Sequence, residues 1–428
     1  MNNEVVMQTA STLHGQLQRG LGRAARRAAD KPGAGEYVYD CIRRDPRWDA
    51  QCESRGLYYA RLMVDLELPV GPVAEHLFDP ADQSEGDDWR VQLALDVLTE
   101  LVRLSRREAA IPLRRYAEEG MHWYDALEAL AGLGDPVLAG GLDSLVAARC
   151  DEPTLDGLVS GYAGPRTAVI ESWAARQPRI AAALARSREA GLARSRENGR
   201  PRRPGGGGPA ARTERTDDEL LGLARRRDDG AVAAIFELGR RRAPGLLDLA
   251  EELLPQRPSR WGGAVCRALR EYGPEALPRA RAWAAAGGRC TDMGLDILAR
   301  HGTRQDIPLL MNELHAALDR RDWGDAAGPI EGLGRLRAGE AVPLLKTAWT
   351  ESTYAYLRPR VLTALTRTAP HTAESYTVEG LWDCEEGVRQ VAAQTAPITA
   401  ETRIRLQRLD HDIAEEPAVR AVAASRLM

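Results

Sequence analysis

Apolar residues recur along this chain every three or four positions, which is the spacing of one face of an α-helix. Two stretches show the pattern most fully: Val91, Ala94, Leu95, Leu98, Leu101 and Val102, and then Val265, Ala268, Leu269 and Tyr272. The alternation of apolar and polar residues that indicates a β-strand occurs only near residues 354–356, over too few residues to matter. The pattern therefore predicts an all-α fold.

Prolines mark the start of one set of predicted helices. Pro278, Pro308 and Pro343 each follow an aliphatic residue in a similar short phrase, and they lie 30 and 35 residues apart. Pro112 stands in the same kind of phrase in the first half of the chain. Proline is tolerated in the first turn of a helix, because the N–H that it lacks would have no partner there. Each phrase therefore predicts the start of the second helix of a helix pair.

Polar residues mark two further helix starts. Thr216 stands three residues before Glu219, which is the spacing of a capping box. Asp135 followed by Pro136 is typical of an N-cap residue and the first helical position. We expect a helix to begin at each of these places.

Longer phrases also repeat. The sequence of residues 388–393 returns in similar form 31 residues later at 419–424, and each copy follows a pair of glutamates. Tryptophans keep a related interval. We expect Trp89, Trp123, Trp261 and Trp323 to open first helices, and Trp283, Trp349 and Trp382 to lie within or at the end of second helices. A period of 31–35 residues with two helices per unit predicts a helical repeat protein.

The repeated unit combines an acidic or tryptophan start, a Val-Arg-x-x-Ala-Ala helix, a glycine turn and a helix that begins x-Pro-Leu-Leu. This combination resembles HEAT repeats, and more closely the short HEAT-like units of the phycobilin-lyase type. The resemblance is clear over residues 217–428 and fair over 54–150, whereas the phrases typical of ankyrin and tetratricopeptide repeats are missing. It implies an α-solenoid, a superhelix of antiparallel helix pairs.

Composition divides the predicted solenoid into two blocks, residues 36–185 and 216–428. Residues 186–215 between them hold nine arginines, three glutamates and four consecutive glycines, and we expect a disordered, flexible linker. Two roles remain open for this linker. It is either a solvated tether or a basic contact segment for nucleic acid or an acidic partner, although no aromatic residue interleaves its arginines.

Residues 1–35 form a separate basic helical segment, in which Arg19, Arg23, Arg26 and Arg27 follow a helical spacing. The segment has no apolar stretch of the kind found in secretory signals. It is either a solvated first helix or a helix that docks on a membrane surface or a partner.

The composition of the chain adds only a few limits to these predictions. The net charge of −4 excludes a chain that binds polyanions over its whole surface. Lys31 and Lys346 are the only lysines among 58 basic residues, a bias that we attribute to a GC-rich bacterial genome. Six cysteines without a CxxC pair indicate free thiols in a reducing compartment, which favours the cytoplasm. Since no apolar run reaches 18 residues, we expect no membrane partner.

The motifs of nucleotide-binding loops, nucleophile elbows and zinc hydrolases are missing, so the sequence indicates no catalytic residue, metal or cofactor. Arginine and aromatic residues are the remaining candidates for lining a concave binding surface, since both types are enriched in binding hot spots. They are Arg279, Arg281, Trp283, Trp349, Tyr356, Arg358, Arg360, Trp382 and Asp383. For each of these residues taken singly, a salt link between repeats or core packing is the favoured explanation.

These observations favour a non-enzymatic scaffold or adaptor that binds another protein. The alternative is a nucleic-acid-binding protein, in particular a DNA glycosylase of the HEAT-like-repeat kind. Such enzymes resemble this chain in architecture and hold a damaged base with tryptophans and a carboxylate, for which Trp349, Trp382 and Asp383 are the nearest equivalents. A bilin-lyase activity is a further alternative that the type of repeat alone suggests.

Overall fold

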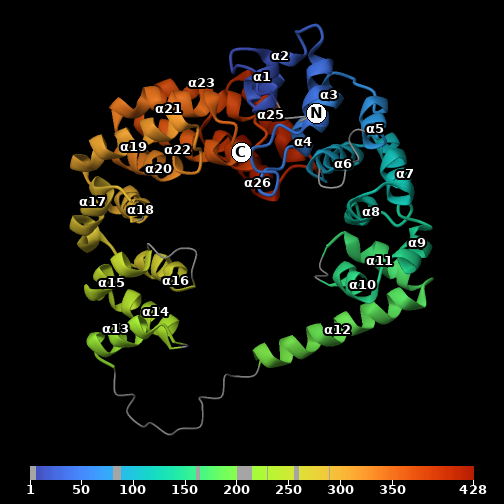
Figure 1. Ribbon diagram of the computed structural model, residues 1–428. Coiled ribbons are helices and arrows are strands. Elements are labelled where there is room, and N and C mark those ends of the chain that lie inside the picture. Colours follow the sequence, from blue (N-terminus) through green and yellow to red (C-terminus); the bar gives the residue numbers. More distant parts are fainter. Residues whose placement is uncertain are drawn as a thin grey trace. The chain divides into compact units, whose positions relative to one another are not determined.

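The computed structural model describes residues 6–80, 88–160, 164–199, 215–228, 230–254, 260–288 and 290–428, with the side chains of 88–90 and 193–199 left out. Every regular element in this part of the chain is a helix, and no strand occurs in it (Figure 1). The prediction of an all-α fold is confirmed. The two apolar stretches that supported it lie in α6 (Asp88–Arg103) and at α16 (Arg260–Leu269), with nearly all of their residues buried.

The chain divides into two compact units. Unit 1 comprises Met1–Gly208 and Glu379–Met428, and unit 2 comprises Pro209–Val378. The boundary between Val378 and Glu379 falls within α23 (Pro370–Gly380). The block expected from the repeats at 216–428 is thus shared between both units, because its last 50 residues pack with the N-terminal half of the chain.

Unit 2 is a succession of helix pairs, coloured from yellow-green to orange in Figure 1. Its helices are α13 (Asp217–Arg226), α14 (Ala231–Arg241), α15 (Gly245–Leu253), α16, α17 (Leu277–Ala286), α18 (Thr291–His301), α19 (Ile307–Arg320), α20 (Ala327–Leu336), α21 (Val342–Glu351) and α22 (Arg358–Thr368). Each odd-numbered helix packs against the even-numbered helix that follows it. Even-numbered helices also pack on each other, α14 on α16, α18 on α20 and α20 on α22.

The proline phrases open helices as predicted, but α17, α19 and α21 are the first helices of the pairs that they form with α18, α20 and α22, whereas we expected second helices. Pro278, Pro308 and Pro343 stand in the first turns of α17, α19 and α21, and Pro112 in the first turn of α7 (Ala110–Glu119). A short 3₁₀ turn precedes each of these helices: η3 (Pro274–Ala276), η4 (Arg304–Asp306), η5 (Gly339–Ala341) and η1 (Arg107–Ala109). A 3₁₀ turn, η6 (Ala355–Leu357), also precedes α22, whose first turn contains Pro359; we did not expect a helix start there.

The predicted capping box is also present. The Thr216 backbone N–H donates to Glu219 Oε2 over 2.8 Å, and the Glu219 N–H donates to Thr216 Oγ1 over 3.3 Å. The predicted helix start at Asp135 is wrong. Asp135 Oδ1 accepts from the Val137 N–H, but residues 136–140 form only turns before Gly141, whose φ of 84° ends helical propagation.

Three of the four tryptophans stand at the start of a helix: Trp89 in α6, Trp123 in α8 (Trp123–Gly132) and Trp261 in α16. Because α7 packs on α8 and α15 on α16, Trp123 and Trp261 open the second helices of their pairs and not the first helices that we expected. Trp323 does not open a helix, because it lies in the turn before α20, where its Nε1 donates to Thr353 Oγ1 over 2.8 Å.

Arginines on α20 and α26 (Pro417–Leu427) donate to backbone carbonyl oxygens at the end of a helix about 30 residues earlier. Arg335 on α20 donates to the carbonyl oxygens of Ala299 (2.8 Å) and Gly302 (2.7 Å) at the end of α18. Arg426 donates in the same way to Ala396 O (2.7 Å), 30 residues earlier, at the end of α24 (Glu386–Thr395). The last carbonyls of a helix have no partner within the helix, so a cation from the next repeat satisfies them and stabilises the helix dipole.

We expect the substitution Arg335→Ala to lower the free energy of unfolding of unit 2 by about 1–2 kcal/mol, because it removes charge-assisted hydrogen bonds to the end of α18. Hydrogen exchange of peptides from α18 and α20 measures this loss. The matched control is Arg367→Ala on α22, an exposed arginine without a hydrogen bond to the described residues. Equal losses in the two variants would contradict the role assigned to Arg335.

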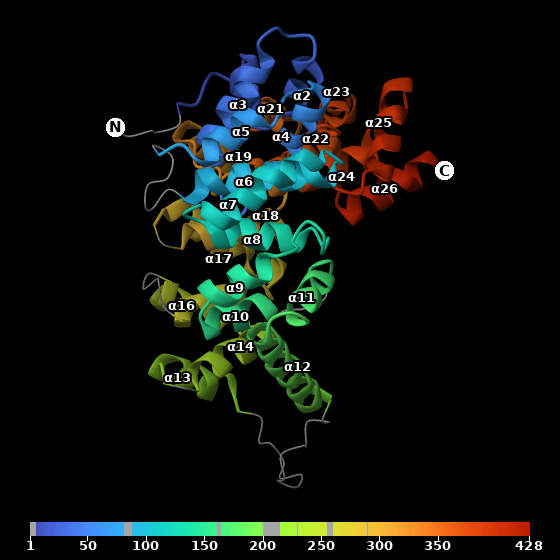
Figure 2. The ribbon, with the colours of Figure 1, turned by 90° about the vertical axis from the view of Figure 1, so that its right-hand side faces the viewer.

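Unit 1 begins with short helices and continues as helix pairs, which Figure 2 shows in sequence order from α3 to α12. Its remaining helices are α1 (Leu13–Gln18), α2 (Gly22–Ala28), α3 (Ala34–Arg44), α4 (Gly56–Asp65), α5 (Gly71–Leu77), α9 (Leu142–Arg149), α10 (Glu152–Val159), α11 (Arg166–Ala174), α12 (Pro178–Gly199), α25 (Ala400–His411) and α26 (Pro417–Leu427).

The predicted disordered linker needs a correction over its first part. Residues 186–199, which we expected to be disordered, continue helix α12. Arginine is a good helix former, and Arg186 and Arg188 have partners on neighbouring helices: Arg186 Nη2 lies 2.7 Å from both Glu152 Oε2 and Asp156 Oδ1, and Arg188 Nη2 lies 2.8 Å from Glu171 Oε1. The rest of the predicted linker, residues 200–214, lies outside the described residues.

The basic N-terminal segment packs against the C-terminal helices of the same unit. Arg23 Nε lies 2.8 Å from Glu379 Oε1, and Arg26 Nη2 lies 2.6 Å from Glu401 Oε1. Gly22 makes this approach close, because a Cβ there would lie 2.0 Å from the Glu379 carbonyl oxygen. Two of the four arginines that suggested a solvated or docking helix therefore bind carboxylates of the chain itself, while Arg19 donates to the backbone carbonyl oxygens of Gln8 and Gly15.

A buried cluster of charges joins α4 to the same C-terminal helices. Glu415 accepts two hydrogen bonds from Arg389, of 2.8 and 2.7 Å, and one of 3.0 Å from Arg61 of α4. Burial alone would raise the pKa of Glu415, but Arg389 and Arg61 lower it to about 2. The ionised carboxylate therefore stabilises the fold.

This cluster predicts acid sensitivity. Because the pKa of Glu415 falls from 4.5 to about 2 on folding, its contribution is complete above pH 4.5 and is lost as the pH falls towards 2. The shift corresponds to a contribution on the order of 3 kcal/mol to unit 1. Unfolding by urea, followed between pH 6 and pH 3, measures it. The free energy of unfolding of the variant Glu415→Gln should fall less over this pH range than that of the natural chain. If the free energy of unfolding depends on pH equally steeply in both proteins, the contribution assigned to the Glu415 carboxylate is wrong.

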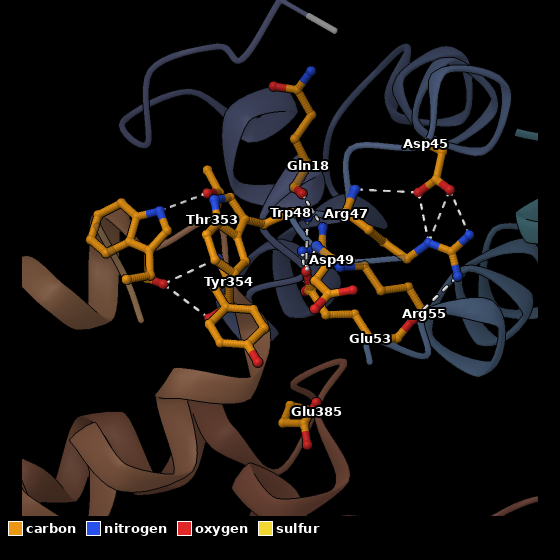
Figure 3. Close-up of polar contacts among 12 residues, drawn as sticks. Gln18, Asp45, Arg47, Trp48, Asp49, Glu53, Arg55, Thr353, Tyr354 and Glu385 are labelled. Carbon is orange, nitrogen blue, oxygen red and sulfur yellow. Dashed lines mark hydrogen bonds and ion pairs between the residues drawn. The ribbon is translucent and has the colours of Figure 1, made fainter. Parts of the chain in front are cut away.

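The connection between α3 and α4 is held by charges that are shielded from solvent (Figure 3). Arg55 and Glu53 form an ion pair of 2.6 Å whose side chains are both 0% exposed. Glu53 Oε1 also accepts from the N–H groups of Trp48 (2.8 Å) and Asp49 (3.0 Å), and Arg55 donates to the Gln18 carbonyl oxygen of α1. The pair thus fixes the path of the loop and ties it to α1.

Candidate functional site

Three of the predicted binding residues lie on α17 and contact the neighbouring repeats. Trp283 is buried, and its Nε1 donates to Glu251 Oε1 of α15 over 2.8 Å. Arg279 donates to the same oxygen over 2.9 Å. Arg281 binds both carboxylate oxygens of Asp306, at 2.7 and 3.0 Å. Trp283 and Arg279 therefore join α17 to α15, and Arg281 joins it to η4.

Four more lie on α21, η6 and α22. Trp349 is completely buried, and its ring meets the edge of the Tyr376 ring at a centroid distance of 5.8 Å. Arg358 is also 0% exposed. Tyr356 is 46% exposed, and Arg360 lies over its ring at 5.2 Å while its Nε binds Glu331 Oε1 at 2.7 Å. Of these four residues, Tyr356 and Arg360 are the two that present aromatic and cationic surface to solvent.

Trp382 and Asp383 belong to unit 1, whereas Trp349 belongs to unit 2. The Trp382 ring lies between two guanidinium groups, Arg26 at 5.1 Å and Arg405 at 5.2 Å. Asp383 is 2% exposed, and its Oδ1 accepts from the Glu385 N–H over 3.0 Å. Both residues contribute to the packing of the N-terminal segment against the C-terminal helices.

A cavity of about 550 Å³ in unit 1 brings together chemistry that the sequence did not indicate. Residues of α1, α3 and α5 line it, and α3 packs against both α1 and α5 (Figure 1). Histidine, tyrosine and carboxylate side chains line it: His14, Glu36, Tyr37, Tyr39, Asp40, Glu75, His76 and Asp79, with Arg43 beside them. Its size is within the range of ligand pockets.

One wall of this cavity is an aromatic stack. The rings of His14 and Tyr37 lie parallel, with centroids 4.8 Å apart and an angle of 11° between the planes. His14 Nε2 lies 3.0 Å from Asp40 Oδ2, and the other oxygen of Asp40 lies 2.7 Å from Arg44 Nε. Asp40 thus orients the imidazole, and the imidazole in turn holds the half-exposed Tyr37 ring in place.

Helix α5 contributes His76, which is buried, and Glu75, which is exposed, to the lining of the cavity. Arg43 Nη2 lies 2.6 Å from Asp79 Oδ2. Tyr39 donates to the Pro69 carbonyl oxygen over 2.7 Å, and burial together with the nearby Glu36 carboxylate raises the pKa of its phenol. The cavity therefore combines a rigid aromatic wall with an excess of carboxylates.

Sequence reasoning missed this site because its parts are common residues in ordinary helical positions. His14 and His76 are separated by 62 residues in the chain and belong to no recognisable motif. The signal that existed was the sequence Glu36-Tyr37-Val38-Tyr39-Asp40, in which polar and aromatic residues share one helix. Nothing in it shows that α1 and α5 cover that helix.

Unit 2 has a smaller cavity of about 410 Å³ between α18, α19 and α20. Asp292, Asp296, Glu313 and Asp325 line it together with Arg320. Burial raises the pKa of Asp325, and the neighbouring Asp322 and Asp292 raise it further. Among the residues that the structure describes, no group of three histidines, cysteines or carboxylates is placed to hold a metal ion, here or elsewhere.

Comparison with known proteins adds no relative. The chain matches no model of a known protein family, and a search of curated proteins finds no match either. Within the described part of the chain, no helix is both long enough and apolar enough to cross a lipid bilayer.

Proposed function

We propose that this chain is a HEAT-like α-solenoid that acts as a non-enzymatic scaffold and binds a protein partner. The observation that carries the proposal is the spacing of the contacts between helix pairs. Trp173 Nε1 donates to Ala139 O across 34 residues, Trp283 Nε1 to Glu251 across 32, and Arg360 binds Glu331 across 29. Contacts at one repeat length in both units are what a stacked array of equivalent helix pairs requires.

An array of this kind offers a long surface made of consecutive helices. In unit 2 the even-numbered helices supply such a surface, because α14 packs on α16, α18 on α20 and α20 on α22. Phe236 of α14 is 37% exposed there, and Arg267 of α16 lies 6.0 Å from its ring. Exposed aromatic and arginine side chains are typical of residues that anchor a protein partner.

The cavity between α1, α3 and α5 supplies a defined recognition point in unit 1. Its Tyr37 ring is half-exposed and held by His14, so little side-chain freedom is lost when a partner contacts it. We also place the protein in the cytoplasm of a bacterium. All six cysteines are free thiols, and the arginine-rich composition supports that origin.

Affinity capture with the full chain tests the proposal. A native extract of the source organism is passed over the immobilised chain and over the tag alone, and bound proteins are quantified by mass spectrometry. We expect one protein to be retained in an amount close to that of the chain. No enrichment over the tag alone would contradict a scaffold.

Incubation with alkylated duplex DNA tests the enzymatic alternative in parallel. We expect no base to be released, because Trp349 is completely buried and Asp383 is engaged with the backbone of its own loop. Release of a modified purine by the natural chain, but not by an Asp383→Asn variant, would replace the scaffold with a glycosylase.

A further inference from the structure

We propose that the cavity between α1, α3 and α5 binds the guanidinium group of an arginine on the protein partner. This inference rests on the proposed scaffold function and names the chemistry of the recognised group. It follows from the balance of charge in the cavity, from its aromatic wall and from its size.

The charge balance shows which carboxylates are already neutralised. Asp79 is paired with Arg43 at 2.6 Å, and Asp40 is held by Arg44 at 2.7 Å and by His14 at 3.0 Å. Glu36 on α3 and Glu75 on α5 also line the cavity, and the described residues supply no ion-pair partner for either of them. Two carboxylates from two different helices therefore face one cavity without a neutralising cation, and this arrangement favours a cationic ligand.

The aromatic wall favours a planar cation. The Tyr37 ring is 40% exposed and lies parallel to His14, so it forms a flat surface backed by a second ring. A guanidinium group stacks on such a surface while its five N–H donors extend in its own plane. A compact ammonium group has no flat face to stack and fewer donors for two separate carboxylates, so arginine fits this site better than lysine.

The phenol of Tyr39 and the neighbouring arginines do not compete for this place. Tyr39 donates to the Pro69 carbonyl oxygen at 2.7 Å, and the guanidinium groups of Arg43 and Arg44 are bound to Asp79 and Asp40. A cavity of about 550 Å³ accommodates an arginine side chain together with the backbone on either side of it. We therefore expect the cavity to bind an arginine side chain that belongs to a peptide segment, and not a small free amine.

NMR of the full chain with carbon-13 in the histidine rings tests this inference. The chain has seven histidines, of which His14 and His76 line the cavity, while the exposed His315 and His371 report on unit 2. The probes are a pentapeptide with one arginine between glycines, the same peptide with uncharged citrulline in place of arginine, and agmatine. We expect the arginine peptide alone to shift the His14 and His76 signals in a saturable way.

A pair of variants locates the site. Glu36→Gln combined with Glu75→Gln should weaken binding of the arginine peptide by about fivefold to tenfold, since two exposed ion pairs are lost. The matched control combines Glu271→Gln with Glu340→Gln, two exposed glutamates of unit 2, and should leave the affinity unchanged. The inference would be overturned if the citrulline peptide shifted the histidine signals as much as the arginine peptide does. It would also be overturned if the variant with Glu36→Gln and Glu75→Gln bound the arginine peptide with unchanged affinity.

Agmatine distinguishes the source of the guanidinium group. If it binds as tightly as the arginine peptide, the site takes a small guanidinium compound and the assignment to a protein partner is wrong. The outcome is also separate from that of the scaffold test. Loss of peptide binding with unchanged capture of a protein would refute the arginine pocket alone, whereas peptide binding without capture would refute the scaffold.

Discussion

The variant Arg55→Met should be the least stable of the charge substitutions in unit 1. Arg55 and Glu53 are both 0% exposed and bind each other at 2.6 Å, so the substitution leaves the Glu53 carboxylate buried without its cation (Figure 3). Breaking a buried ion pair from one side costs about 3–5 kcal/mol. Hydrogen exchange of peptides from α1, α3 and α4 measures the expected fall in the free energy of local unfolding.

Arg188→Met is the matched control for this experiment. Arg188 Nη2 lies 2.8 Å from Glu171 Oε1, but both side chains are more than half exposed. An exposed ion pair contributes about 0–1 kcal/mol, so this variant should remain close to the natural chain in stability. If the two variants lose the same amount, burial of the Arg55–Glu53 pair is not what stabilises the loop between α3 and α4.

Trp349→Ala should produce the second large effect, in unit 2. The side chain is 0% exposed and meets the Tyr376 ring at a centroid distance of 5.8 Å, so its removal opens a cavity between α21 and α23. Truncation of a buried tryptophan costs about 3–5 kcal/mol. Urea unfolding, combined with hydrogen exchange of peptides from α20 to α22, measures the loss.

Tyr356→Ala provides the comparison, because Tyr356 belongs to the same set of predicted binding residues but is 46% exposed. The free energy of unfolding of the Tyr356→Ala variant should fall by no more than about 1 kcal/mol, since the main contact of the Tyr356 side chain is the cation–π pair with Arg360 at the surface. A small loss for Trp349→Ala, similar to that for Tyr356→Ala, would mean that the Trp349 side chain is not part of the core and would restore it as a candidate for ligand binding.

The proline phrases and the capping box show what a local signal can predict. Pro278, Pro308 and Pro343 open helices because proline restricts its own backbone and that of its neighbour, whatever lies around it. Thr216 and Glu219 cap α13 by hydrogen bonds within four residues. Asp135 shows the limit of such signals, since an equally good local cap is followed by glycines that prevent a helix from continuing.

The binding residues could not be predicted in this way. Arginine and tryptophan at repeat spacing are expected both on a binding surface and between repeats, and sequence does not say which neighbour each side chain meets. In the structure Trp283, Arg279 and Arg281 meet carboxylates one repeat away. The cavity with His14 and His76 depends on the packing of three helices, and no spacing along the chain encodes that packing.

The sequence by itself determined the helical nature of this protein and the starts of several of its helices, because these follow from contacts among residues close together in the chain. Only the tertiary structure decided which helices from the two ends of the chain pack together in unit 1. Arg23 meets Glu379 across 356 residues, and Arg61 meets Asp412 across 351. Such pairs form when apolar faces of distant helices are buried together and bring their charges within reach. The positions of the charges alone do not select among the many carboxylates available.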